Sequence, residues 1–371
     1  MQKEKEIIET LLEGTGVSIN GNAPYDPQVH NTQFYSRVLR QGSLGLGEAY
    51  IDGWWDCESL DQFFHRVLRQ DTDKKLKPTL PLMAYLAWNS IRNPGVRSKA
   101  FEIGQRHYDI GNDLYSVMLD RRLTYTCAYW KNAATLDEAQ EAKLDLICRK
   151  IGLRKGQSVL DIGSGWGCFI RYAAEKYGAE ASGITVSEKQ KEMAEDMCSG
   201  LPARTLLQDY RDIRGQYDHI VSLGMIEHVG YRQYRTFMEV AHRAIKDGGL
   251  FLLQTIGSNR SVKSTDRWIS KYIFPNSMIP SIAQLSKAAE GLFVIEDLHN
   301  FGADYDRTLM AWYHNIRDNW DKLKARYDNS FYRMWTYYLL SCAGSFRARK
   351  NQLWQFVLSK NGVNNGYVPV R

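Results

Sequence analysis

The chain has 371 residues, of which 44% are hydrophobic and 24% are charged, and its formal net charge is +6. Its length suggests two domains, and its apolar fraction excludes a disordered chain, a collagen-like fibre and a small disulfide scaffold. The longest stretch without Asp, Glu, Lys or Arg has 15 residues and contains two prolines, whereas a membrane-spanning helix needs about 20 apolar residues. We therefore expect no membrane span.

The cysteines give no sign of a metal or disulfide framework. All 6 lie at least 20 positions apart, and no Cys-x-x-Cys pair occurs. The charged N-terminus is followed by no apolar core, so no signal peptide is visible. These features predict a reduced, cytoplasmic protein without a metal site.

The first part of the chain is predicted to be a small helical domain. Apolar residues recur at helical spacing through most of it, and the glycine-rich segment 42–47 is expected to break the helices. Further on, basic residues and prolines bracket an apolar segment, 79–88, which suits a linker helix or a helix lying on lipid. We expect an N-terminal helical domain over 1–75, a linker over 76–97 and a catalytic domain with lipid-binding insertions over 98–371.

From about residue 135 the sequence changes to alternating helices and strands. Thr135 and Glu138 have the spacing of a capping box, and an apolar helical face follows them. The strands expected from short apolar runs are 158–162, 180–184, 204–208, 217–225 and 250–256. Helices are expected between them. This alternation indicates βαβ units, so the predicted fold class is α/β with a doubly wound sheet.

A glycine-rich turn, Asp161-Ile-Gly163-Ser-Gly165-Trp-Gly167, follows the first predicted strand. Glycines allow a tight turn, and the helix behind them offers free backbone amides to an anionic or carboxylate-bearing ligand. A plain strand-to-helix connection and a dinucleotide site are the alternatives. The glycines occupy alternate positions and an acid precedes them, which favours S-adenosylmethionine. The pattern resembles the first motif of class I methyltransferases, and this implies that the turn wraps the methionine part and that Asp161 reaches its amino group.

Two later strand ends extend this resemblance. Gln208-Asp209-Tyr210-Arg211 is similar to the place where such methyltransferases contact adenine, although Asp209 also suits a turn or a helix cap. After the second strand the chain has Thr185 and Gln190 in place of the usual acid. That departure resembles one branch, the cyclopropane-fatty-acid-phospholipid synthases and the mycolic acid cyclopropane synthases, in which these two residues would contact the cofactor.

The resemblance to this branch covers nearly the whole chain. The blocks that carry it include 124–130, 224–230, 255–257, 310–313 and 342–347, and segment 42–55 is similar to the extra domain of the phospholipid synthases. The cofactor contacts that it implies are Tyr125, Thr126, Asp161, Gly163, Ser164, Gly165, Gly167, Thr185, Gln190, Asp209, Tyr210 and Arg211.

The reaction implied by the resemblance adds the S-adenosylmethionine methyl group to a cis double bond of a phospholipid acyl chain. A proton is then lost as the cyclopropane ring closes, and the base is taken to be a bound bicarbonate. An alkene is a weak nucleophile, so catalysis should rest on positioning and on the exclusion of water. The catalytic pocket implied for this reaction comprises Cys127, Glu227, Gln254, Ile256 and Tyr305, with Cys342 as a further candidate.

Each of these positions also has a simpler interpretation. Glu227 could form a loop salt bridge, Tyr305 could be a packed aromatic, and Cys127 and Cys342 could be small apolar residues, as free cysteines commonly are. Gln254 stands where the family has His, and Gln can donate a hydrogen bond but cannot carry a charge. With Gln in place of His, we expect the affinity for bicarbonate to differ and a His-dependent pH profile to be absent.

Three alternative functions are open on the sequence. They are O- or N-methylation of a soluble small molecule, a noncatalytic lipid-binding module, and methylation of nucleic acid. Residues 305–371 carry 11 Lys/Arg against 4 Asp/Glu, which suits a solvated face or an anionic partner surface. Because no base-methylating block or RNA-binding module is found, no nucleic-acid partner is expected. The resemblance implies a homodimer that docks peripherally on anionic phospholipid at the inner face of the membrane.

Overall fold

The computed structural model describes residues 2–70, 111–275 and 277–371. The predicted linker over 76–97, with its apolar segment 79–88, lies outside the described residues. The chain divides into two compact units: one takes its residues from Met1–Met118, Thr265–Pro275 and Leu309–Lys350, the other from Leu119–Ser264, Asn276–Thr308 and Asn351–Arg371. The predicted domain boundaries, which do not interleave in this way, stay a prediction.

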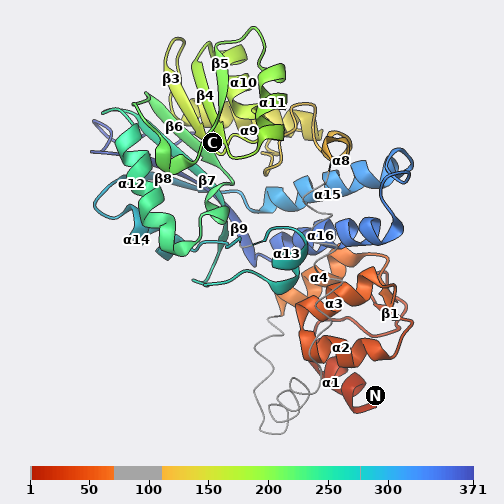
Figure 1. The fold of residues 1–371 in the computed structure, drawn as a ribbon. Helices are drawn as coiled ribbons and strands as arrows, with labels where there is room; N and C mark the ends of the chain where they lie inside the picture. The colour runs from red at the N-terminus through yellow and green to blue at the C-terminus, as the bar shows by residue number, and fades with distance from the viewer. Residues whose placement is uncertain (1, 71–110, 276) are drawn as a thin grey trace. The chain divides into compact units, whose positions relative to one another are not determined.

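The first unit consists mainly of helices, as expected for the N-terminal region. The helices of its described residues are α1 (Gln2–Leu12), α2 (Gln33–Gln41), α3 (Ser43–Ile51), α4 (Leu60–Arg69), α8 (Asn112–Met118), α13 (Arg267–Tyr272), the later part of α15 (Ala303–Asp318), η4 (Trp320–Lys322) and α16 (Asn329–Arg347). Two short antiparallel strands, β1 (Gln28–Val29) and β2 (Trp55–Asp56), pair beside them. Helix α16 packs on α3 and α4, which are distant from it in the sequence (Figure 1).

The packing of α16 on α4 depends on a glycine. A Cβ atom at Gly344 would lie 2.5 Å from the carbonyl oxygen of Asp61, so only glycine lets the helices approach this closely. Arg347 then forms an ion pair with the Asp61 carboxylate at 2.5 Å, and Arg333 forms one with Asp56 at 2.7 Å. The C-terminal half of the sequence therefore supplies the helix that closes the N-terminal core.

The glycine-rich segment 42–47 is helical, so the expected break over this whole segment is wrong. Only Gly42, with φ at +60°, interrupts the helices, and α3 begins at the next residue. Within α3, a Cβ atom at Gly45 would lie 2.5 Å from the Arg37 carbonyl oxygen, and one at Gly47 would lie 2.3 Å from the Trp268 indole nitrogen. The glycines serve close packing of α3 against its neighbours.

The second unit contains a seven-stranded sheet, which confirms the predicted α/β fold. The spatial order is β5-β4-β3-β6-β7-β9-β8. The strands are β3 (Ser158–Ile162), β4 (Glu180–Thr185), β5 (Ala203–Leu207), β6 (His219–Leu223), β7 (Leu250–Ser258), β8 (Val294–Asn300) and β9 (Asn351–Ser359). Strands β3 to β7 pair in parallel, whereas β9 runs antiparallel between β7 and β8. The sequence predicted the first five strands but not β8 and β9.

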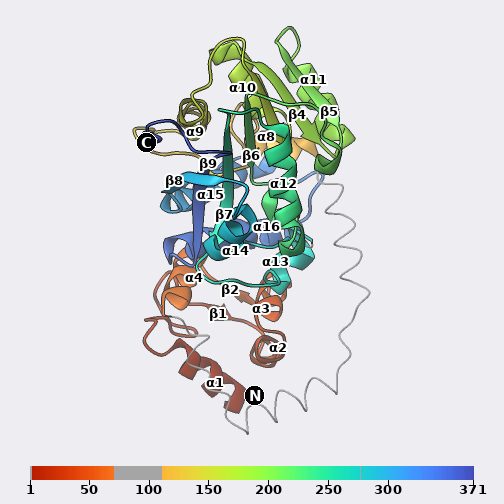
Figure 2. The ribbon, with the colours of Figure 1, turned by 90° about the vertical axis from the view of Figure 1, so that its left-hand side faces the viewer.

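Helices cover both faces of this sheet. They are α9 (Leu136–Lys150), α10 (Cys168–Tyr177), α11 (Glu188–Met197), α12 (Tyr234–Ala244) and α14 (Ile282–Ala289). One core joins the sheet to α12 and α14, and a second core joins its other face to α9 and α10. Figure 2 shows α12 and α14 in front of β7. This sandwich leaves the carboxyl ends of the parallel strands at one edge, where open α/β sheets bind their ligands.

No helix in the described part of the chain is both long and apolar enough to cross a membrane.

Candidate functional site

The turn after β3 has the conformation that its glycines predict. Gly163, Gly165 and Gly167 have φ angles of +89°, +54° and +81°, which other residues rarely adopt. The amides of Gly163 and Ser164 donate to the carbonyl oxygen of Ile184 at the end of β4, which fixes the turn to the neighbouring strand. A Cβ atom at Gly165 would meet nothing within 4 Å, so the turn opens toward free space there.

Asp161, in β3 just before this turn, is the residue that most clearly calls for a ligand. Its side chain is only 2% exposed, and its Oδ1 atom has no hydrogen-bond partner among the described residues. Burial raises its pKa to about 7, although the nearby positive charge of Lys143 opposes this rise. An unpartnered buried carboxylate oxygen beside an open glycine turn fits the amino group of S-adenosylmethionine.

Thr185 and Gln190, expected at the second strand end, do lie together. The Thr185 hydroxyl donates to Oε1 of Gln190 at 2.8 Å, and Ser187 between them caps α11 by accepting the Gln190 amide. The two residues therefore form one polar pair after β4, and their contact with a cofactor stays a prediction.

Asp209 acts as a helix cap, the simpler of its two interpretations. Its carboxylate accepts the backbone amide of Arg211 at 2.9 Å and binds the Arg211 guanidinium through two bonds of 2.8 and 2.7 Å. Tyr210 is buried in the core, with its ring centroid 5.4 Å from that of Phe237. These contacts do not decide whether Asp209 also binds adenine, so that role stays a prediction.

The segment that carries Tyr125, Thr126 and Cys127 is fixed by α9. Gln140 donates to the carbonyl oxygens of Thr124 at 3.2 Å and Thr126 at 2.8 Å, and Lys143 donates to the Thr126 hydroxyl at 3.0 Å. Sequence reasoning missed both helix residues. A signal existed, because Gln140 lies four residues from Leu136 and from Leu144 and so falls on the predicted apolar face of the helix.

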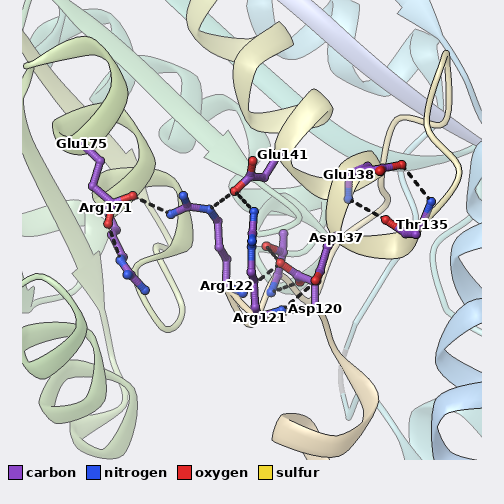
Figure 3. Close-up of polar contacts among 10 residues, drawn as sticks. Asp120, Arg121, Arg122, Thr135, Asp137, Glu138, Glu141, Arg171 and Glu175 are labelled. Atoms are coloured by element: carbon purple, nitrogen blue, oxygen red, sulfur yellow. Dashed lines mark hydrogen bonds and ion pairs between the residues drawn. The ribbon is translucent and has the colours of Figure 1, made fainter.

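An arginine–carboxylate network holds the turn that precedes this segment (Figure 3). Arg122 binds Glu141 of α9 at 3.0 Å and Glu175 of α10 at 2.9 Å. The Asp120 carboxylate accepts the amides of Arg122 and Thr124 at 3.0 and 2.8 Å. The turn is thus attached to α9 and α10, the two helices that pack together on one face of the sheet.

Cys127 is a fully buried, neutral thiol. Its Sγ atom donates to the carbonyl oxygen of Ala128 at 3.2 Å, and burial, with the nearby Asp304 carboxylate, raises its pKa well above the ordinary value. A thiol in this state is a poor nucleophile. Beyond it, Thr308 and Asp304 accept the amides of Ala128 at 3.1 Å and Trp130 at 2.8 Å.

Glu227 lies in η2 (Ile226–His228), just after β6, and it directly contacts Ile256 at the end of β7. One carboxylate oxygen accepts the Ile256 amide at 2.7 Å, and the other has no partner in the described chain. Burial raises the Glu227 pKa to about 7. The alternative of a loop salt bridge finds no support, since no cation among the described residues pairs with it.

Gln254 lies in β7, two residues before Ile256 and opposite Leu223, the last residue of β6. Its Oε1 atom accepts the side-chain amide of Gln355 on β9 at 2.9 Å, and its own Nε2 has no partner within the described ranges. Both side chains are buried, and the two residues lie opposite each other in the β7–β9 ladder. Gln355 was not predicted, because its role depends on a strand pairing that the sequence did not reveal.

Two further predicted residues, Tyr305 and Cys342, lie on helices. Tyr305 is buried in the first turn of α15, next to Asp304. Cys342 lies in α16, in the other compact unit, and burial raises its pKa to about 12. Hydrogen bonds join Glu227 to Ile256 and Gln254 to Gln355, and a pocket formed by all five predicted residues stays a prediction.

Comparison with known proteins decides the family. A model of the family described as "Mycolic acid cyclopropane synthetase" matches residues 96–356. The chain is 49% identical to the cyclopropane-fatty-acyl-phospholipid synthase of Escherichia coli K12 over 360 residues, which cover 97% of this chain and 94% of the relative. The chain belongs to the cyclopropane synthase family. It is therefore an S-adenosylmethionine-dependent methyltransferase with the class I methyltransferase fold.

Solved structures of cyclopropane synthases share this fold. The mycolic acid cyclopropane synthase CmaA1 complexed with SAH and CTAB is 31% identical, with a TM-score of 0.65 over 70% of this chain and 98% of that one. The cyclopropane synthase MmaA2 from Mycobacterium tuberculosis gives 30% identity and a TM-score of 0.64, again over 70% and 98%. The coclaurine N-methyltransferase, at 22% identity and a TM-score of 0.66, is similar in fold alone.

Proposed function

We propose that this cyclopropane synthase adds the methyl carbon of S-adenosylmethionine across a cis double bond of phospholipid acyl chains, forming a cyclopropane ring. The relative that is 49% identical over nearly the whole chain bears the name of that activity. The observation on this molecule that supports it best is Glu227, a buried carboxyl with one oxygen held by the Ile256 amide and the other unpartnered in the described chain.

The chemistry of the methyl donor is transfer of its sulfonium methyl group to carbon, with the sulfur leaving as a neutral thioether. Asp161 would hold the amino group of the donor, and the glycine turn would wrap its methionine part. Thr185 with Gln190, and Asp209, would bind the ribose and the adenine. These residues fix the donor so that its methyl group meets the double bond rather than water.

The second step removes a proton from the added methyl carbon while the ring closes. We propose that a bicarbonate ion accepts this proton. The unpartnered Nε2 of Gln254 is a fixed hydrogen-bond donor suited to an anion, and the second oxygen of Glu227 can bind the hydroxyl of bicarbonate. Cys127, Ile256 and Tyr305 complete the proposed pocket, and Cys342 is proposed as a further catalytic candidate.

The protein is proposed to work at the inner face of the cytoplasmic membrane as a peripherally bound homodimer. The N-terminal domain, 1–75, would help the catalytic domain, 98–371, to reach the bilayer. The basic composition of residues 305–371 supports attraction to anionic headgroups.

The test is direct. Purified protein is incubated with S-adenosylmethionine, bicarbonate and vesicles of monounsaturated anionic phospholipid, and the acyl chains are analysed by mass spectrometry. We expect cofactor-dependent gain of one CH₂ group and resistance of the product to ozone, since a cyclopropane has no double bond. A gain of CH₂ with ozone cleavage would indicate an unsaturated branched product instead. Absence of any gain on lipid would overturn the proposed substrate.

A further inference from the structure

Lys143 is a fully buried lysine with a single hydrogen bond among the described residues. Lys143 lies in α9, and its side chain has no exposed surface. Within the described residues it donates one hydrogen bond, to Thr126 Oγ1 at 3.0 Å. The titratable groups that face it are the carboxyls of Asp120 and Asp161 and the thiols of Cys127 and Cys168. Burying an ammonium group is costly in free energy, so a residue of this kind calls for an explanation.

The hydrogen bond to Thr126 has a chemical consequence. Burial lowers the pKa of Lys143, and the surrounding thiols and carboxyls oppose that change. In its charged form the ammonium group can only donate, so the Thr126 oxygen accepts and the hydroxyl proton is left to donate to a different acceptor. Gln140, one turn earlier in α9, holds the carbonyl oxygens of Thr124 and Thr126. The backbone of this segment and the direction of its hydroxyl donor are thus set by two side chains of one helix.

The charge of Lys143 has a second consequence, at Asp161. Burial favours the protonated form of this carboxyl, and the positive charge of Lys143 favours the ionised form. The methyl donor ends in an amino acid group that carries an ammonium and a carboxylate. An ionised Asp161 suits the ammonium, and a hydroxyl donor at Thr126 suits the carboxylate.

We propose that Lys143 is a positioning residue for the methyl donor: its hydrogen bond orients the Thr126 hydroxyl as a donor, and its charge favours the ionised form of Asp161. Lys143 does not touch the donor in this arrangement. The inference rests on the proposed cofactor contacts of Thr126 and Asp161 and is independent of the lipid substrate.

Binding of S-adenosylhomocysteine to the full chain, measured by titration calorimetry between pH 6 and 9, tests this role. Lys143→Met should weaken binding at pH 8 about 10- to 100-fold, the effect expected when a charge-assisted hydrogen bond is lost. In the unchanged protein, affinity should fall as pH drops through about 7, where Asp161 takes up a proton. In Lys143→Met that fall should begin at higher pH, because the charge that favours ionised Asp161 is gone.

Two comparisons separate positioning from a structural effect. Lys150→Met removes another fully buried lysine of α9, one that contacts His299 and Asp297, and it should leave the affinity and its pH midpoint unchanged. Lys143→Gln keeps a donor for Thr126 without the charge, so it should recover affinity at pH 9 but keep the shifted midpoint. In Thr126→Val, adding Lys143→Met should cost less than it does alone.

A Lys143→Met protein that binds S-adenosylhomocysteine with unchanged affinity and midpoint would overturn the proposal. So would a variant whose melting temperature falls while the affinity of its folded fraction stays the same. If the unchanged protein binds S-adenosylhomocysteine with these dependences but adds no CH₂ to phospholipid, the proposed lipid reaction fails and the role of Lys143 stands.

Discussion

Two buried carboxyls, Asp161 and Glu227, stand out at the scale of single residues. Each lies at or just past the carboxyl end of a strand, in β3 and after β6, and these strands are neighbours in the sheet. Each has one oxygen without a partner in the described chain, and burial raises each pKa to about 7. Because the folded state holds these protons more tightly than the unfolded state, the free energy of unfolding should fall as pH rises from about 4 to about 7.

Glu227→Gln tests both the loss of stability caused by ionising a buried carboxyl and the proposed catalytic role of Glu227. The amide cannot ionise, so we expect the free energy of unfolding at pH 8 to rise by roughly 1–3 kcal/mol, measured by urea unfolding. Turnover on lipid should drop severely while binding of S-adenosylhomocysteine stays nearly unchanged. A variant that is less stable than the unchanged protein would mean that Glu227 is a structural residue.

Gln254→His introduces the residue that the family resemblance implies at this position. A histidine can be charged at low pH and would then attract an anion, so the bicarbonate affinity of the variant should increase as pH falls, whereas with Gln254 this increase is absent. The measurement is turnover against bicarbonate concentration in depleted buffer at several pH values. Gln355→Leu is the matched variant. It should lower the affinity for bicarbonate, because the Gln254 side chain loses the hydrogen bond that holds it in place. Identical profiles for all three proteins would contradict the role of Gln254.

At the scale of elements, the agreement between sequence and structure depends on how local the signal is. Strand β3 and the capping box at Thr135 were predicted because an apolar run and a cap are encoded in consecutive residues, and both are present. Strand β8 was missed because Val294, Ile295 and Leu298 are exposed and a register shift interrupts its alternation. The turn conformation was predictable from its glycines, whereas the Gln254–Gln355 pair depends on a ladder between distant segments.

Helix α3 shows a different kind of failure. Glycine lowers helix propensity, so a glycine-rich segment predicts a break when it is taken alone. Here the missing side chains at Gly45 and Gly47 give space to Arg37 and Trp268, and packing outweighs propensity.

Gly47→Ala should therefore destabilise the protein although alanine favours helices. We expect a loss of about 1–3 kcal/mol in the free energy of unfolding, the usual cost of overpacking, since the new methyl group would overlap the Trp268 ring. Ser43→Ala, at an exposed position of the same helix, is the control and should change stability little. Stabilisation by Gly47→Ala, measured by thermal unfolding, would show that α3 is not closely packed there.

At the scale of the whole molecule, the charge is unevenly distributed along the chain. Residues 305–371 hold 11 Lys/Arg against 4 Asp/Glu, an excess of 7 positive charges, while the whole chain carries only +6. The attraction of this positive charge to an anionic surface is long-ranged at low salt and is screened within about 10 Å at 0.1 M.

Binding to vesicles should consequently depend on salt and on lipid charge. We expect affinity for anionic vesicles to fall by about tenfold or more between 0.05 and 0.5 M salt, and neutral vesicles to bind weakly throughout. Co-sedimentation with vesicles measures both dependences. Equal binding to neutral and anionic vesicles at all salt concentrations would exclude an electrostatic contribution.

The position of β9 has a consequence for how the protein is made. Strands β7 and β8 each pair with β9, which lies between them. A nascent chain on the ribosome therefore cannot complete either pairing until residue 359 has been synthesised. Until then β7, which carries Gln254 and Ile256, presents an open strand edge, and such edges recruit other chains. The β7 edge is thus left open from the time residue 258 is made until residue 359 has been made.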